Sequence, residues 1–261
     1  MLRDLSILFS TSKLQMKQSL VRPTYRFCVA VQPIIYSIIT YMMFKDSGQK
    51  NFAAFAILGT GILTLWSTIC FSSAGDIERE RYMGTLEAIY STPTSFRTIV
   101  LGKIIGNTIL GIAPFIISFV IIRFVFGAQV NINNIPIFLL SFLVTILSFM
   151  GISMLFATWF TLSRDARMLM NCIEYPVFIL CGVLFPIEIL PIWTRPFSYM
   201  LSPTWAVKLL RMSIDGINDF KMFYTYLLIL VGITIFYFVS AYMLFNRIDK
   251  ETRIRATLGV S

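Results

Sequence analysis

Six long apolar runs divide the chain, at about residues 27–44, 53–74, 98–126, 136–162, 171–190 and 222–245. Each run is near the roughly 20 residues that a helix needs to cross about 30 Å of hydrocarbon. The runs are continuous and do not alternate between apolar and polar residues, which disfavours a β-barrel. The pattern therefore predicts an all-α membrane protein with six transmembrane helices, forming a single membrane domain over residues 1–261.

The composition agrees with this class. Hydrophobic residues make up 57% of the 261 residues and charged residues only 13%, whereas about a quarter of an ordinary soluble domain is charged. The formal net charge of +9 is also found in nucleic-acid-binding proteins. However, no soluble segment interleaves basic residues with aromatic ones, and no nucleic-acid partner is expected.

The basic residues concentrate on one side of the predicted membrane. If the N-terminus lies inside, the cytoplasmic segments hold the basic residues within 1–26, 79–103, 164–167 and 247–255. The other side holds only Lys45, Lys50, Arg195, Lys208, Arg211 and Lys221. Cytoplasmic loops of membrane proteins carry an excess of Lys and Arg, so both termini are predicted to be cytoplasmic and to face anionic membrane lipids.

The N-terminal segment, residues 1–26, has no continuous apolar core and is not expected to be a cleaved signal peptide. Leu2, Leu5, Met16 and Leu20 fall roughly on one helical face, together with Leu8 or Phe9 and Ser12. This spacing predicts an amphipathic helix at the inner membrane interface. Its role is either a lever beside a partner protein or a simple anchor.

A dense charge cluster follows the second apolar run, within residues 75–93. Charged side chains at bilayer depth cost several kcal/mol each, so the cluster is predicted at the cytoplasmic rim. Asp76 is expected to cap a short helix whose first turn carries Glu78 and Glu80, and Gly84 and Pro93 punctuate its course and exit. The segment is either a docking surface or a solvated loop that only satisfies membrane topology.

The chain lacks the residues of common catalytic and metal sites. It contains no His, and Cys28, Cys70, Cys172 and Cys181 lie within apolar runs without metal-ligand spacing. We therefore predict no catalytic, metal or cofactor-binding residues. A Gly-x-x-x-x-Gly-Lys-Ser/Thr phosphate loop is also missing, so energy for any transport must come from a partner or a gradient.

Arg123 and Glu174 are two ionisable residues within the apolar runs whose roles are open. Arg123 lies near the outer end of the third run and either snorkels to the interface or contacts an anionic substrate. Glu174 lies near the cytoplasmic end of the fifth run. An intramembrane carboxylate suggests function by default, but an ion pair between Lys103 and Glu174 is the alternative.

The segment 186–211 combines proline with large aromatic residues. Proline breaks the helical hydrogen-bond ladder, so this segment is predicted to form short helices that enter the outer leaflet and return. Its residues Pro186, Pro191, Trp193, Pro203 and Trp205 are the candidates for an outer gate.

Several motifs resemble the ABC-2 type family of ABC transporter permeases. They are Glu78-Arg79-Glu80-Arg81, Gly84-Thr85-Leu86-Glu87, Ser91-Thr92-Pro93 and Gly102-Lys103, followed by the hydrophobic segments 182–193 and 202–207. The resemblance implies that residues 75–93 are a cytoplasmic coupling helix that docks on an ATP-binding subunit, and that the later hairpin caps the path outside. The implied contacts are Asp76, Glu78, Arg79, Glu80, Arg81, Gly84, Thr85, Leu86 and Glu87, with a candidate second contact at Arg164, Asp165 and Arg167.

The resemblance also implies a function. The chain would be the transmembrane subunit of an ATP-driven exporter, paired with a second copy of itself or a homologous permease. Two copies of an ATP-binding subunit would hold ATP and Mg²⁺, so the chain itself would bind no cofactor and would not be an enzyme. The expected cargo is amphipathic, drug-like, lipid-linked or a glycan, moved across a cell membrane, which we expect to be the bacterial cytoplasmic membrane.

Two other classes remain as alternatives. An intramembrane lipid-modifying enzyme would need catalytic polar residues clustered at one membrane level, and the sequence shows none beyond the charged segment. A non-transporting scaffold or sensor with the same fold is the other alternative.

Overall fold

The computed structural model describes residues 2–45, 52–92, 94–127, 132–162, 166–183, 187–217 and 219–255. Within these ranges the chain folds into helices and contains no strand. Five helices among them are long and apolar enough to cross a membrane: Tyr25–Met43, Ala56–Tyr82, Phe96–Val125, Ile135–Thr161 and Phe220–Arg247. The prediction of a helical, multi-pass membrane architecture is therefore confirmed, with five long spans in the described part of the chain.

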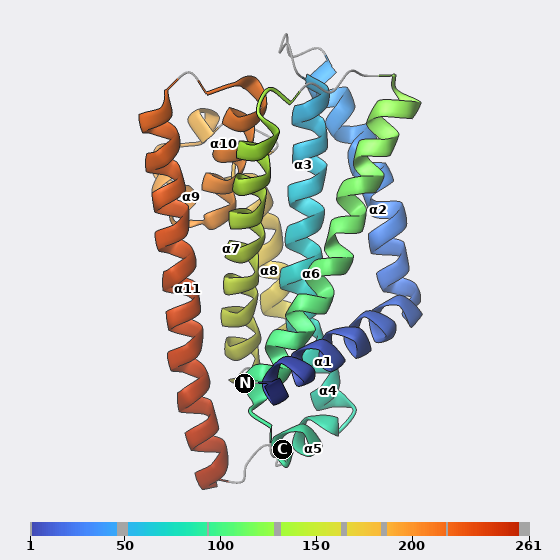
Figure 1. Cartoon of the computed structure of the whole chain (residues 1–261), viewed down its shortest axis with the longest axis vertical. Coiled ribbons are helices and arrows are strands. Elements are labelled where there is room, and N and C mark those ends of the chain that lie inside the picture. Colours follow the sequence, from blue (N-terminus) through green and yellow to red (C-terminus); the bar gives the residue numbers. More distant parts are fainter. Residues whose placement is uncertain are drawn as a thin grey trace.

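The first two spans form an antiparallel hairpin. Helix α2 (Pro23–Lys45) precedes α3 (Phe52–Trp66), and the two helices pack side by side (Figure 1). Thr40 and Thr60 join them through a hydrogen bond of 2.8 Å between their hydroxyls. Helix α3 then passes through a π-helical turn, η1 (Ser67–Phe71), directly into α4 (Ser72–Tyr82).

The continuity of α3, η1 and α4 corrects one expectation. The sequence predicts that Asp76 caps the start of a separate short helix, but Asp76 lies inside α4, in the last turns of a long helix. A new short helix, α5 (Thr85–Tyr90), begins only after Gly84. Gly84 has φ of +69°, a conformation that residues with a Cβ rarely adopt. This glycine therefore makes the reversal between α4 and α5 possible.

Three further long helices complete the bundle. Helix α6 (Phe96–Val120) ends in the π-helical η2 (Ile121–Val125), and α7 (Ile135–Leu162) packs against α11 (Phe220–Arg255). The core between α3, α6 and α7 is aromatic: the buried Trp66 ring lies 5.5 Å from the Phe149 ring in an edge-on contact.

The fifth predicted run, residues 171–190, does not form a long helix. Helix α8 (Ala166–Leu180) has only 15 residues, which is short of the roughly 20 needed to cross the hydrocarbon core. Gly182, with φ of +71°, follows its end, and a 3₁₀ turn, η3 (Ile187–Ile189), comes next. The sixth continuous span expected from hydropathy is thus not found among the described residues.

The proline-rich segment forms two helices that differ in length. Helix α9 (Arg195–Met200) and helix α10 (Ser202–Asp215) each have a proline in their first turn, Pro196 and Pro203. Proline is tolerated there because the first helical N–H groups have no partner within the helix. The segment is therefore not one straight helix. Helix α10 packs against α7 and α11, and α9 lies beside α10 and α8, near one end of the bundle (Figure 1).

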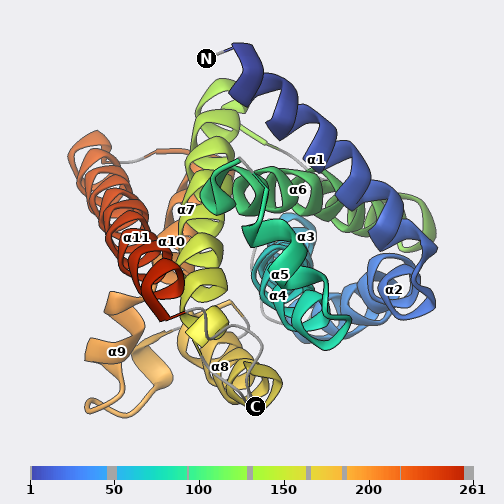
Figure 2. The same cartoon turned by 90° about the horizontal axis from the view of Figure 1, so that it is seen from below.

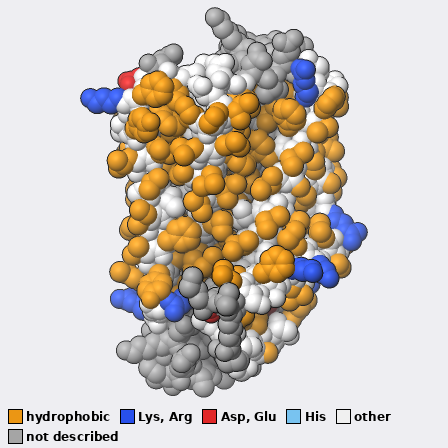
Figure 3. All heavy atoms as spheres, viewed as in Figure 1, with side chains coloured by type: hydrophobic (Ala, Val, Ile, Leu, Met, Phe, Trp, Pro, Cys, Tyr) orange, Lys and Arg blue, Asp and Glu red, His pale blue; other side chains and the backbone are white. Residues whose placement is uncertain are grey.

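Many large apolar side chains of the described helices are exposed. Figure 3 shows hydrophobic side chains over the middle of the visible face and Lys or Arg side chains toward its two ends. An exposed apolar band of this extent suits contact with lipid, and the basic side chains at its borders suit the lipid head groups.

Helix α1 (Leu2–Val21) runs across the bundle and packs along α6 (Figures 1 and 2). Its buried residues are polar: Ser12, Gln15 and Ser19. The apolar Phe9 and Leu20 are exposed instead. A helix over the predicted N-terminal segment is confirmed, whereas Ser12, grouped with the apolar face on sequence grounds, is buried inside the protein.

Candidate docking site

The turn between α4 and α5 projects from the end of the bundle. Tyr82 is 93% exposed and Met83 is 58% exposed, and Gly84 and Thr85 are exposed beside them. We call residues 82–85 the tip. Leu86, for which the sequence predicts a contact with a partner, is buried beneath it. The tip therefore offers apolar side chains and backbone, whereas the carboxylates of Asp76 and Glu80 lie behind it.

A buried polar network lies behind the tip, around Asp76. The Asp76 side chain is only 2% exposed and forms an ion pair with Arg22, with 2.6 Å between carboxylate oxygen and guanidinium nitrogen. The Asn107 side-chain amide donates a hydrogen bond to Asp76 at 3.0 Å. Gln15 donates to the same carboxylate, so Asp76 is bound by groups from α1, from α6 and from the residue that links α1 to α2.

The same network includes the amides and a hydroxyl of α1 and α6. The Gln15 amide donates to Asn107 Oδ1 at 3.1 Å and to Ser19 Oγ at 3.0 Å. A buried charge is tolerated when it is paired and hydrogen-bonded. Asp76 is therefore an internal residue that joins three segments distant in sequence, and its carboxylate is not exposed on the segment where the sequence predicts contact with a partner.

Close approach of α1 to α6 makes this network possible. A Cβ atom added at Gly106 would lie 2.7 Å from the Ser12 carbonyl oxygen, and one at Gly102 would lie 2.8 Å from Thr11 Cβ. Real Cβ atoms do not approach other atoms so closely. The two glycines of α6 therefore allow α1 to reach the level of Asn107 and Asp76.

A second ion pair joins the charged segment to α6. Lys103, almost fully buried, pairs with Glu80 of α4. The predicted pair of Lys103 with Glu174 is wrong, because Lys103 points toward α1 and α4, while Glu174 lies on α8 and accepts a hydrogen bond of 2.9 Å from Ser67 Oγ. Hydropathy places both residues at a similar depth, but they face different neighbours.

The other predicted contacts divide between exposed and internal positions. Arg81 donates hydrogen bonds to the carbonyls of Thr161 and Phe160 at the end of α7, where free helical carbonyls attract cations. Glu78 and Arg79 are half-buried. Arg164, Asp165 and Pro186 lie outside the described residues, as do the side chains of Arg167 and Glu87.

The candidate gate residues lie at the opposite end. Trp193 is 73% exposed and Pro191 is also exposed, whereas Pro203 is buried at the start of α10. The half-buried Trp205 donates its indole N–H to the Tyr199 carbonyl at 2.8 Å. Arg123 is exposed in η2.

Sequence reasoning missed Gln15, Ser19 and Asn107 as site residues. Asn107 carried a usable signal, because an amide within an apolar run needs a polar partner inside the protein. Gln15 and Ser19 carried none, since polar residues on an interfacial helix are usually solvated. No group of three or more His, Cys, Asp or Glu side chains suited to a metal ion occurs in the described part of the chain.

Comparison with known proteins identifies the family. A search of curated proteins finds no match to this chain. The family model for the ABC-2 type transporter matches residues 8–214. The matched region runs from α1 to α10 and contains the network, the tip and the α9–α10 hairpin. Because the match covers most of the chain, this protein belongs to the ABC-2 type transporter family and is a transmembrane component of an ABC-type transporter.

Proposed function

We propose that this chain is the transmembrane subunit of an ATP-driven exporter and that its tip docks on a separate ATP-binding subunit. The observation that carries the proposal is the exposure of Tyr82 and Met83 beside a charged segment whose Asp76 and Glu80 are used internally. Large exposed apolar side chains at a turn favour a protein partner. The family implies association with an ATP-binding subunit in general, and this subunit would hold ATP and Mg²⁺.

The helical connections support a mechanical role for the docked turn. Because α3, η1 and α4 are continuous, a displacement of the tip acts directly on a membrane span. The network through Asp76 ties the same segment to α1 and α6. A partner that moves the tip would therefore move α1, α3 and α6 together.

The proposed assembly contains two ATP-binding subunits and a second copy of this chain or a homologous permease. Helix α2 supports a shared seam, because only 17% of its most apolar stretch is buried inside this chain. Its surface is therefore available to a second membrane subunit or to lipid. The α9–α10 hairpin would lie outside as the gate, with Trp193 at interfacial depth and both termini in the cytoplasm. The cargo would be amphipathic, drug-like, lipid-linked or a glycan, exported across a bacterial cytoplasmic membrane.

The test is co-purification of the ATP-binding subunit with two matched double variants. Tyr82→Ser/Met83→Ser removes the exposed apolar groups of the tip, and Ile192→Ser/Met200→Ser removes similarly exposed groups near the α9–α10 end. We expect the first variant to bind the subunit about tenfold or more weakly, because central apolar contacts carry most of an interface's affinity. The second variant should bind like the unmodified chain.

ATP hydrolysis stimulated by cargo provides the second measurement. Membranes reconstituted with both subunits should hydrolyse ATP in response to cargo, and the tip variant should lose this response while remaining folded. ATP hydrolysis by the purified chain alone, or full subunit binding by the tip variant, would contradict the proposal.

A further inference from the structure

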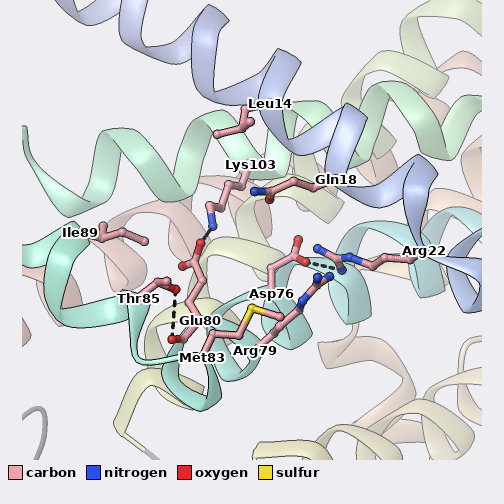
Figure 4. A pocket seen from close by; sticks show the side chains of 10 residues that line it. All are labelled: Leu14, Gln18, Arg22, Asp76, Arg79, Glu80, Met83, Thr85, Ile89 and Lys103. Carbon is pink, nitrogen blue, oxygen red and sulfur yellow. Dashed lines mark hydrogen bonds and ion pairs between the residues drawn. The ribbon is translucent and has the colours of Figure 1, made fainter.

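A cavity of about 280 Å³ lies between α1 and the α4–α5 segment (Figure 4). Its lining combines the charged side chains of Arg22, Asp76, Arg79, Glu80 and Lys103 with polar and apolar ones. Two of these other lining residues, Met83 and Thr85, belong also to the exposed tip. The cavity is therefore continuous with the surface to which we assign the partner.

The charges that line this cavity do not cancel. Arg22 pairs with Asp76, and Lys103 pairs with Glu80. Arg79 takes part in neither of these two ion pairs, and its side chain extends toward Arg22 and Asp76 (Figure 4). Two guanidinium groups thus lie near one carboxylate, which leaves a positive charge for a second anion. Arginine binds carboxylates well because its planar fork can donate two parallel hydrogen bonds.

The side of α1 that lines the cavity is nearly opposite to its exposed apolar side. Ile7, Thr11, Leu14 and Gln18 recur every three or four residues and line this cavity or the adjoining one of about 240 Å³. Phe9, Lys13, Met16 and Leu20 follow the same spacing two residues later. Two residues correspond to about 200° around a helix with 3.6 residues per turn. If the Phe9 side rests on lipid, the cavity opens away from it.

We propose that this cavity receives an Asp or Glu side chain of the ATP-binding subunit, with Arg79 as its ion-pair partner and Gln18 as an additional hydrogen-bond donor. The inference rests on the proposed function and extends it: α1 becomes part of the docking surface. A protein carboxylate fits the cavity better than a lipid phosphate, because the cavity adjoins the tip and faces away from the Phe9 side of α1. The apolar walls from Leu14, Met83 and Ile89 suit the methylene groups of such a side chain.

The decisive experiment converts this contact into a covalent bond. In the Arg79→Lys variant, assembled with its ATP-binding subunit, a water-soluble carbodiimide activates a nearby carboxylate. The primary amine introduced at position 79 then displaces the urea, and an amide forms with net loss of one water. Mass spectrometry should identify an amide between residue 79 and an Asp or Glu of the subunit. The unmodified chain should not form it, since a guanidinium does not couple.

Native Lys17 is the internal control, because it is exposed on a different face of α1. It should give no product with the subunit. An amide only to Asp76 or Glu80 of the same chain, with none to the subunit, would overturn the inference. The inference would also be overturned if the Arg79→Glu variant lost a bound anionic lipid but still bound the subunit as the unmodified chain does.

Affinity measurements separate this inference from the proposed function. Arg79→Glu should weaken subunit binding about tenfold, since juxtaposed like charges oppose association, and Arg79→Lys should retain most of it. Lys13→Glu makes the same charge change on the opposite face and should have little effect. If the tip variant loses subunit binding, but Arg79→Glu binds normally and no cross-link to the subunit forms, the inference fails and the proposed function stands. If neither the tip nor Arg79 affects binding, both fail.

Discussion

The two ends of the molecule neutralise basic side chains in different ways. At the α1–α4 end, Arg22 and Lys103 pair with the carboxylates of Asp76 and Glu80. At the α9–α10 end, Arg211 donates to the Val183 carbonyl at 2.9 Å. The difference follows from the backbone, because α4 is a regular helix whereas the described residues within 181–194 are largely irregular and leave carbonyl oxygens without helical partners.

Other cations of the α9–α10 end follow the same rule. Arg195 donates to the Leu190 carbonyl at 3.3 Å, and the Lys208 ammonium lies 4.7 Å from the centre of the Tyr199 ring and 5.3 Å from that of Trp205. Carbonyl dipoles and ring faces stabilise a cation without burying a second charge. The comparison teaches that Arg22 and Lys103 at the α1–α4 end depend on carboxylates of a neighbouring helix, whereas the contacts of Arg195 and Lys208 depend on the local course of the chain.

The largest expected effect comes from removing the central carboxylate. Asp76→Ala leaves Arg22 without its ion-pair partner and removes the acceptor used by Gln15 and Asn107. Breaking a buried ion pair from one side costs about 3–5 kcal/mol. We expect a markedly lower melting temperature of the purified protein. The double variant Arg22→Met/Asp76→Leu should recover much of the loss, and equal losses in both would contradict the pairing.

A smaller effect is expected at the opposite end. Arg211→Met removes the donor to the Val183 carbonyl. A hydrogen bond to a charged group contributes about 1.5–3 kcal/mol, so thermal unfolding should shift less than for Asp76→Ala. Arg211→Lys should retain part of the stability. A loss as large as that of Asp76→Ala would remove the distinction between the two ends.

The smallest effect concerns the contact between α1 and α6. Gly106→Ala places a methyl group against the Ser12 carbonyl, and overpacking of this kind costs about 1–3 kcal/mol. Trypsin cleavage within α1, at Lys13 or Lys17, should become faster as the helix is displaced. Gly232→Ala is the matched control, because nothing lies within 4 Å of its added Cβ. Equal cleavage of both variants would show that α1 does not need this close approach.

Much of the architecture was predictable because hydrophobic runs report burial in lipid directly. The first to fourth and the sixth apolar runs correspond to the five long helices among the described residues. The fifth run has no matching long helix among the described residues, because hydropathy cannot register a backbone break: residues 181–190 are largely apolar, yet Gly182 adopts a positive φ and helix α8 ends at Leu180. The hydropathy averaged over a stretch of residues carries no information about such a turn.

The candidate site was predictable only in its location. The family resemblance predicts a docking segment after the second run, and the exposed tip, Tyr82 to Thr85, lies within that segment; its docking role stays a prediction. Its chemistry was different from the expectation, because Asp76 and Glu80 point inward and the exposed groups are Tyr82 and Met83. A list of charged residues cannot tell which of them meet an opposite charge from another helix.

The sequence alone determines the membrane character, the helical class, the positions of most spans and the membership of the family. These properties depend on local composition and motifs. Partner choice among charged side chains is not local: Lys103 binds Glu80 and not Glu174 because α4 and α1 cover that side of α6, while α8 lies elsewhere. The network of Gln15, Asp76 and Asn107 likewise exists only once three distant segments pack together. Such contacts depend on helix rotation and spacing, which tertiary packing alone decides.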